Sequence, residues 1–293
     1  MSASKRHSGQ LGMLMTHGHR RDSVRWIITF SVALAASLCA ALVGFKPIGA
    51  KADTVPAATF DTAIEHYRSR LVGDVDQSIA SVKKLHDSIS GGDLAAAKQA
   101  WIDARVGWER SEVFTSGFAP DLDREIDAWP NGATGFHAIE AKLFGAAGPT
   151  GVEGEVDALL HNLSDMAVTA RNITLTPQGL FDGLTRLAYE VGESKLDGGE
   201  SYLSGTSVDD MRHNIEGIEL AYSMIFAPVI EARDPDHHAE ALHLIAELKT
   251  MLAERDLRQI DQEKLRALSE ELVLTLQMTA PAIALARPTL EFQ

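Results

Sequence analysis

Residues 60–92 read FDTAIEHYRSRLVGDVDQSIASVKKLHDSISGG and carry the strongest structural signal in the chain. Apolar side chains recur here at steps of three and four residues, a period that places them on one face of an α-helix. The apolar positions are Phe60, Ile64, Tyr67, Leu71, Val75, Ile79, Val82, Leu85 and Ile89. Two glycines then end the pattern, because glycine favours the turn that closes a helix. The stretch therefore predicts one long amphipathic helix.

The rest of the body repeats this helical pattern. We expect helices over 93–118, about 134–144, 152–173, 177–195, 207–232, 237–255 and 261–287, with a loop from Ala119 to about Asn131. Pro177 suits a first turn, whereas Pro228 is expected to kink or end its helix. Alternating β-patterns with hairpin turns do not occur in the sequence. We therefore predict an all-α fold, in which eight helices form two packed antiparallel four-helix bundles.

The charge of the chain is unevenly distributed. Its 293 residues carry 27 basic and 41 acidic side chains, a formal net charge of −14. Residues 1–52 hold seven of the basic residues and one acid, which leaves a net charge of −20 on residues 53–293. Such a body repels phosphate backbones and attracts cations, so we expect cationic ligands and no nucleic-acid partner. The single cysteine, Cys39, excludes intramolecular disulfides and multi-thiolate metal sites.

The first 52 residues have the order of an export signal. Arginines within 20–25 precede an uncharged apolar stretch over 26–45, and Ala-Lys-Ala at 50–52 supplies a small-residue cleavage motif. We predict a signal peptide cleaved near Ala52. A retained inner-membrane anchor is the alternative, because the stretch approaches the length that spans a bilayer. In both cases residues 53–293 are exported to the periplasm, since the basic flank stays inside.

One predicted helix carries residues suited to hold a cation. Trp101, Arg105, Glu109 and Glu112 follow one another at spacings of four, four and three, which stacks their side chains on one helix face. Two carboxylates one turn apart repel each other unless a positive charge lies between them. Arg105 is placed to pair with Glu109, and a metal ion could bridge Glu109 and Glu112.

The short helix predicted over 134–144 adds an imidazole and a carboxylate. His137 and Glu140 are three residues apart, so their ligand atoms can converge, and Gly135 allows close backbone approach. The loop before this helix is crowded with the acids Asp121, Asp123 and Asp127. An oxygen-rich set with one imidazole suits iron, manganese or zinc better than cuprous copper.

Taken in order, these motifs resemble the imelysin-like family. The likeness is carried by Trp101-x3-Arg105-x3-Glu109-x2-Glu112, Asp121-Leu-Asp-x2-Ile-Asp127, Gly135-Phe-His-Ala-Ile-Glu140, Ser194-Lys195 with Glu200, and Asn214-x2-Gly217. At position 108 this chain has Trp where the family often has Tyr. The likeness covers most of 57–290. Within the family, the chain is most similar to short Efe-type periplasmic iron-uptake components that lack a cupredoxin domain.

The resemblance implies a metal site in a cleft between two helical bundles. Its ligands would be Glu109, Glu112, Asp127, His137 and Glu140, with Arg105 and Trp101 beside them. The ion would be divalent or trivalent, with iron expected and zinc or copper as alternatives. An inner-membrane iron permease and a periplasmic peroxidase are the implied protein partners. We expect membrane contact only through an uncleaved N-terminal segment.

Three functions stay open on this sequence. We favour periplasmic metal capture or uptake over imelysin-type metallopeptidase activity, in which Glu140 would be the base and Arg105 the oxyanion stabiliser. The zincin motif H-E-x-x-H is missing, and nothing else in the sequence specifies a substrate groove. The third function is binding of an acidic polysaccharide through a bridging cation. A further histidine-rich segment, 236–243, has overlapping H-x-x-E and E-x-x-H spacings but lacks the partner motif of a di-iron bundle.

Overall fold

A computed structural model describes residues 55–290 except 128–132, 147 and 197–199. Every regular element in this part of the chain is helical, which confirms the predicted all-α class. None of these helices is both long enough and apolar enough to cross a membrane. The predicted signal peptide or anchor, residues 1–52, lies outside the described residues.

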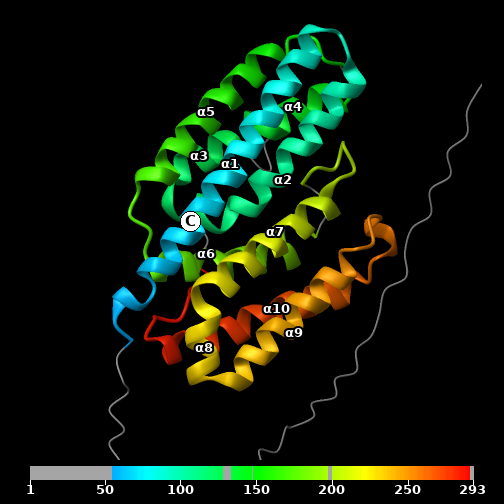
Figure 1. Cartoon of the computed structure of the whole chain (residues 1–293). Helices are drawn as coiled ribbons and strands as arrows, with labels where there is room; N and C mark the ends of the chain where they lie inside the picture. Colours follow the sequence, from blue (N-terminus) through cyan, green and yellow to red (C-terminus); the bar gives the residue numbers. More distant parts are fainter. Residues whose placement is uncertain (1–54, 128–132, 147, 197–199, 291–293) are drawn as a thin grey trace, which may run out of the picture. The chain divides into compact units, whose positions relative to one another are not determined.

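The helices form two sets along the chain (Figure 1). The first set is α1 (Asp61–Ser90), α2 (Leu94–Phe118), α3 (Pro120–Ile126), α4 (Gly135–Leu143) and α5 (Glu153–Asn172). The second set is α6 (Pro177–Gly192), α7 (Ser207–Ala221), α8 (Ala227–Arg233), α9 (Pro235–Met251) and α10 (Gln262–Thr279). Short 3₁₀ helices lie at Ala57–Thr59, Leu257–Gln259 and Ala280–Ile283.

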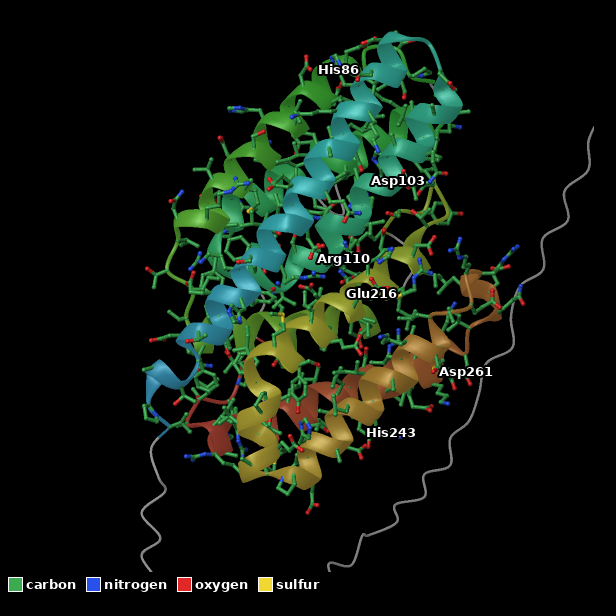
Figure 2. All side chains as sticks on the ribbon, viewed as in Figure 1. His86, Asp103, Arg110, Glu216, His243 and Asp261 are labelled. Carbon is green, nitrogen blue, oxygen red and sulfur yellow. The ribbon has the colours of Figure 1, made fainter. Side chains whose placement is uncertain are left out.

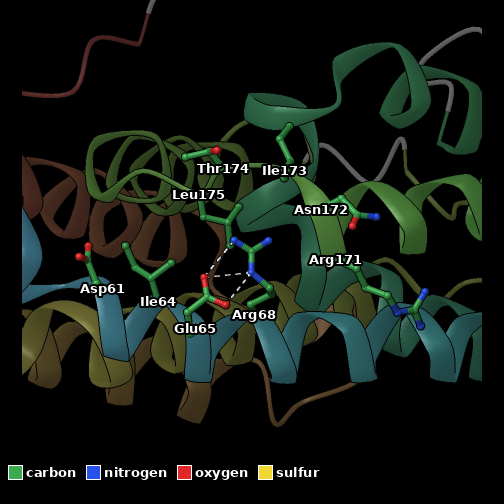
Figure 3. A pocket seen from close by; sticks show the side chains of 9 residues that line it. All are labelled: Asp61, Ile64, Glu65, Arg68, Arg171, Asn172, Ile173, Thr174 and Leu175. Atoms are coloured by element: carbon green, nitrogen blue, oxygen red, sulfur yellow. Dashed lines mark hydrogen bonds and ion pairs between the residues drawn. The ribbon is translucent and has the colours of Figure 1, made fainter.

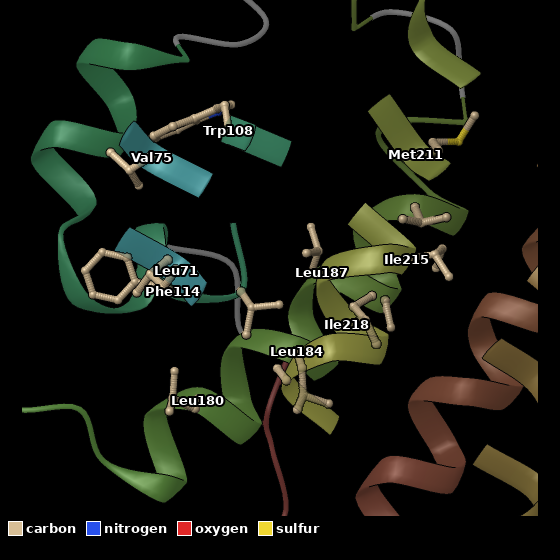
Figure 4. Close-up of a cluster of buried hydrophobic side chains, with 14 of the residues drawn as sticks. Leu71, Val75, Trp108, Phe114, Leu180, Leu184, Leu187, Met211, Ile215 and Ile218 are labelled. Atoms are coloured by element: carbon tan, nitrogen blue, oxygen red, sulfur yellow. The ribbon is translucent and has the colours of Figure 1, made fainter. Parts of the chain in front are cut away.

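Helix α2 connects the two sets. Helix α1 packs along α2 and α5, and α10 packs along α6 and α9. Helix α2 also contacts α6 and α7, which belong to the second set. Buried apolar side chains of α1, α2, α6 and α7 fill the space around these contacts (Figure 4). The arrangement of the helices as two antiparallel four-helix bundles stays a prediction.

Glycines allow α6 and α7 to approach α2 closely. A Cβ atom at Gly183 of α6 would lie 1.9 Å from the carbonyl oxygen of Val113. One at Gly217 of α7 would lie 2.5 Å from the carbonyl oxygen of Arg110. Side chains do not fit at such distances, so the backbones meet directly. The side chains that α2, α6 and α7 project at this junction are thereby brought together.

The predicted loop from Ala119 to about Asn131 is wrong in its first half, because residues 120–126 form α3. Pro120 occupies the first turn, where a helix needs no N–H donor. Asp121 and Asp123 in the same turn complement the positive end of the helix dipole. Ile126 is fully buried and anchors the other end of the helix in the core.

The break in the helix predicted over 207–232 lies ahead of Pro228 rather than at it. Helix α7 ends at Ala221, and a π-helical turn over Tyr222–Phe226 leads into α8. Pro228 lies in the first turn of α8. The wider π turn changes the hydrogen-bonding pattern just before the proline, where a missing N–H would otherwise interrupt it.

We predict that Gly183→Ala destabilises the protein by about 1–3 kcal/mol, because the new Cβ atom meets a backbone carbonyl rather than a flexible side chain. Gly73→Ala is the matched control, since Gly73 is exposed on α1 and a Cβ atom there meets nothing within 4 Å. This control should be neutral or stabilising by up to about 1 kcal/mol. Urea unfolding followed by circular dichroism measures both variants. Equal stabilities would contradict the close contact of α6 with α2.

Candidate metal centre

The buried guanidinium of Arg105 is the centre of the candidate site. Its side chain is 2% exposed, and Nη1 lies 2.5 Å from Oδ1 of Asp127. Nη2 lies 3.1 Å from Oε1 of Glu200 and 3.1 Å from Oδ2 of Asp210. Glu109, one turn further along α2, forms another ion pair with Nη2. Because a buried charge is costly unless it is paired, these four carboxylates stabilise the guanidinium in the core.

A second buried cation, the ammonium of Lys195, lies among the same carboxylates. Its Nζ atom is 3.1 Å from Oε2 of Glu109, 3.0 Å from Oε2 of Glu112 and 2.9 Å from Oε1 of Glu200. Asn214 of α7 donates through Nδ2 to Oε2 of Glu109 and Oε2 of Glu112, at 2.8 and 2.7 Å. We use the name acidic cluster for Glu109, Glu112, Asp127, Glu200 and Asp210.

His137 faces the acidic cluster with one ring nitrogen and Glu140 with the other. Nε2 lies 3.1 Å from Oδ1 of Asp127 and 4.0 Å from Oε1 of Glu200, whereas Nδ1 lies 3.3 Å from Oε2 of Glu140. The backbone N–H and the hydroxyl of Ser204 both donate to Oε1 of Glu140, at 2.8 and 2.7 Å. Glu140 therefore orients the imidazole from the side away from the cluster, as a carboxylate often does behind a metal-binding histidine.

Local sequence explains how α3 and α4 present Asp127 and His137. Asp127 directly follows α3, and the indole N–H of Trp108 donates to its Oδ2 at 2.7 Å. Gly135 has a φ of +65°, and a Cβ atom there would lie 1.9 Å from the carbonyl oxygen of Ile126. The start of α4 can therefore lie against the end of α3. This is the close backbone approach that the sequence predicted at Gly135.

Asp127 and His137 stabilise each other's charged forms. Burial opposes ionisation of Asp127, but Arg105 and His137 hold the pKa of this carboxyl far below its ordinary value. Burial also opposes ionisation of His137 and by itself would lower its pKa. The carboxylate of Asp127, together with hydrogen bonds to Asp127 and Glu140, raises that pKa to about 9.

Other members of the acidic cluster are harder to ionise. Burial, followed by the charge of Glu109, raises the pKa of Glu112 well above its ordinary value. Burial raises the pKa of Asp210 to about 7 against the opposing effect of Arg105. Five carboxyl groups thus share two basic side chains and one imidazole. The cluster therefore has more acidic groups than its own cations neutralise, and an added cation would stabilise their ionised forms.

Two groups of donor atoms in the described residues could each hold an ion. The first comprises Asp127, His137 and Glu200, and the second comprises Glu109, Glu112, Asp127 and Glu200. Within each group the donor atoms lie within 4.8 Å of one another. Atoms bound to one metal at about 2.0–2.5 Å can be at most about 5 Å apart, so both groups fit a metal ion in size. Carboxylates with an imidazole also fit iron in chemistry.

Four of the five predicted ligands lie in these groups, namely Glu109, Glu112, Asp127 and His137. Glu140 does not; it contacts His137 at Nδ1 instead. Which of these residues bind a metal stays a prediction. Of the two residues expected beside the ligands, Arg105 lies at the centre, as described. Trp101 donates from its indole N–H to the carbonyl oxygen of Phe136 at 3.0 Å, and its ring centroid lies 5.8 Å from the Arg105 guanidinium.

Sequence reasoning did not assign several residues of the site. Glu200 belongs to both donor groups, Asp210 pairs with Arg105, and Lys195 and Asn214 contact the cluster directly. The available signal was the family resemblance around 194–200 and 214–217, since no spacing rule connects these segments to α2. Asp121, by contrast, has a side chain that is 94% exposed and pairs with Arg124 on the surface.

The histidine-rich segment 236–243 contributes to neither donor group. Nδ1 of His237 lies 2.9 Å from the Asp234 carboxylate, and the Tyr222 hydroxyl lies 3.1 Å from Nδ1 of His238. His243 is exposed on α9 (Figure 2). Local contacts thus engage His237 and His238, and the segment supplies no ligand to either donor group.

A pocket of about 440 Å³ lies between α1 and residues 171–175 (Figure 3). Its lining includes an ion pair in which Nε of Arg68 lies 3.1 Å from Oε2 of Glu65. None of its lining residues belongs to the acidic cluster. The pocket is therefore separate from the candidate metal centre.

The fold and the site together define an all-helical protein with a buried cluster of carboxylates at the junction of its helices. The chain belongs to the imelysin family, whose model, described as peptidase M75, matches residues 63–133 and 131–281. The resemblance predicted from the motifs is thereby confirmed.

The chain is also similar to components of iron uptake systems. EfeO of Escherichia coli O157:H7 is 28% identical over 200 residues, which cover 65% of this chain and 53% of that protein. EfeM of Pseudomonas syringae pv. syringae is 28% identical over 198 residues, which cover 64% of this chain and 68% of that protein. The chain thus spans about half the length of the EfeO relatives that it matches.

A solved structure shares the fold. It is the crystal structure of a protein from Parabacteroides distasonis that was assigned as an iron-regulated protein A precursor. The superposition has a TM-score of 0.55 and 17% sequence identity, and it covers 80% of this chain and 93% of that chain. At this identity the likeness shows the fold alone.

We predict that His137 in the metal-free protein titrates near pH 9, because Asp127 and Glu140 favour the imidazolium. The contribution of the raised His137 pKa to stability should be complete below about pH 6.5 and should be lost as the pH rises through about 9. Asp127→Asn should move the pKa of His137 down by more than one unit, whereas Asp121→Asn should leave it unchanged. NMR titration of the imidazole signals measures all three proteins. A wild-type pKa at or below 6.5 would contradict the ion pair.

Proposed function

We propose that the chain is an exported metal-binding protein that captures iron for an uptake system, with the acidic cluster and His137 as its site. The observation that carries the proposal is the buried convergence of Asp127, His137 and Glu200, whose donor atoms lie within 4.8 Å of one another. Glu109 and Glu112 supply further carboxylates at the same centre. The names of the relatives, iron uptake system components, support iron over zinc or copper as the ion.

Iron is the cargo in this proposal. The role of the protein is to give up protons as it binds the ion and later to release the ion. Asp127 and Glu200 would supply negative charge, and His137 would supply a neutral nitrogen after losing its Nε2 proton. Glu140 and Ser204 would keep the imidazole aimed at the cluster in both states.

The proposed place of action is the periplasm. The support is the basic, apolar and small-residue order of the first 52 residues, which delivers the acidic body across the inner membrane whether or not the segment is cleaved. The proposed partners are an inner-membrane iron permease and a periplasmic peroxidase. Both follow from the likeness to iron uptake components and not from a surface on this chain.

Peptide hydrolysis has less support from the same residues. A metallopeptidase needs a general base and a free group that stabilises the oxyanion. Glu140 accepts two hydrogen bonds from Ser204 and pairs with His137, and Arg105 is engaged by four carboxylates. Binding of an acidic polysaccharide also has little support, because the ion-paired side chains of the site are at most 12% exposed and a polymer could not reach them.

A cleavage assay separates the two main functions. We expect no chelator-sensitive cleavage of casein by the full chain under conditions in which it binds iron. Chelator-sensitive cleavage that is lost in Glu140→Gln would overturn this expectation and establish a peptidase.

Anaerobic titration of the full chain with Fe(II) should show about one tightly bound ion. Asp127→Asn, His137→Gln and Glu200→Gln should each weaken binding by at least about tenfold, because each removes one donor from the buried group. Equilibrium dialysis with elemental analysis measures bound iron, and thermal unfolding checks that each variant is folded.

Two matched controls separate the site from the general negative charge of the body. Asp121→Asn and His161→Gln change the same residue types at side chains that are 94% and 75% exposed. Both should bind Fe(II) as wild type does. Equal affinity in wild type and in all three site variants would show that the site is elsewhere.

A further inference from the structure

The ammonium of Lys195 lies among carboxylates of the second group of donor atoms. Its Nζ atom is within 2.9–3.1 Å of one oxygen from each of Glu109, Glu112 and Glu200, and its side chain is 5% exposed. These three carboxylates, with Asp127, are the second group of donor atoms. That group therefore already contains a cation, and this cation is part of the chain.

Hydrogen bonds also fix the backbone of the residues that form this ion pair. Helix α6 ends at Gly192, and the backbone N–H of Lys195 donates to the carbonyl oxygen of Glu190 at 3.0 Å. Similarly, the hydroxyl of Ser207 donates to the carbonyl oxygen of Glu200. Lys195 and Glu200 are thus each fixed by a hydrogen bond of their own backbone.

An ammonium is a suitable substitute for a metal ion in such a group. It is a compact point charge with three N–H donors, whereas a guanidinium is broad and planar. Lys195 forms ion pairs with three separate carboxylates. A divalent ion added to the same group would lie within a few ångströms of the ammonium, and the two like charges would repel strongly in a buried site.

The first donor group differs from the second, because Lys195 pairs with one of its members, Glu200, but with three members of the second. It contains His137 in place of Glu109 and Glu112, and it shares Asp127 and Glu200. We propose that Lys195 is an internal counter-cation that fills the second group and thereby limits the chain to one metal ion, held by the first group. This inference rests on the proposed function, because it concerns how many ions the same site accepts and how tightly.

The test uses Mn(II) as the probe, because its unbound fraction can be counted directly by EPR. The full-length wild type should bind one Mn(II) ion. Lys195→Gln should either bind a second ion or bind one ion at least tenfold more tightly, since the competing charge is gone. Glu112→Gln combined with Lys195→Gln removes a donor together with the ammonium, and it should bind no more than one ion.

Melting temperatures separate the counter-cation role from a purely structural role for Lys195. In both cases, removing the lysine leaves buried carboxylates unpaired, so the metal-free Lys195→Gln protein should unfold at a lower temperature than wild type. If the lysine acts as a counter-cation, Mn(II) should raise the melting temperature of this variant by more than it raises that of wild type. A lower melting temperature that Mn(II) does not restore would indicate a structural role alone.

A second variant keeps the proposal testable if Lys195→Gln does not fold. Lys195→Ala leaves space for a small cation, so ethylammonium in solution should raise its melting temperature and should compete with Mn(II). Folded Lys195 variants with the stoichiometry and affinity of wild type would overturn the counter-cation role. A different result would be that wild type binds no Mn(II) whereas Lys195→Gln binds one ion. This result would support the counter-cation role of Lys195 and overturn the proposed function.

Discussion

The ion pairs of Arg105 are the interaction on which the arrangement of the described helices depends. One buried guanidinium contacts carboxylates from four places: Glu109 on α2, Asp127 after α3, Glu200 after α6 and Asp210 on α7. Removing the guanidinium would leave these buried carboxylates without their shared counter-charge, which costs several kcal/mol. The electrostatic centre therefore ties both sets of helices to α2. The apolar core supplies the driving force for folding, and this centre fixes which helix ends meet.

Close backbone contacts make that centre geometrically attainable. Carboxylates reach a shared guanidinium only if their helices lie unusually near α2, and Gly183 and Gly217 remove the side chains that would separate them. Gly135 does the same where α4 meets the end of α3. Packing and electrostatics are thus coupled in this fold. A methyl group added at one of these positions would disturb the ion pairs as well as the core.

The sequence predicts the fold class and one half of the site, because both depend on short-range periodicity. The spacing of Arg105, Glu109 and Glu112 on one helix and the H-x-x-E pair on another are visible without knowing the tertiary structure. Lys195 and Glu200 are not, since they lie in an irregular segment far from α2 in sequence. Helix α3 was missed for a related reason. Its one proline and three acids resemble a loop in composition, whereas the burial of Ile126 shows that it packs on the core.

If the acidic cluster holds a cargo ion, as we propose, the two cations within it have a consequence for its release. A structural zinc site typically unfolds without its metal, because nothing else neutralises the ligands. Here Arg105 and Lys195 stabilise much of the carboxylate charge from within. In the proposed function the fold would then not depend on the ion, and the binding free energy would be set by the charge that those two residues leave unneutralised. A site built in this way exchanges some affinity for reversibility, which is the property that a carrier requires and a permanent cofactor site does not.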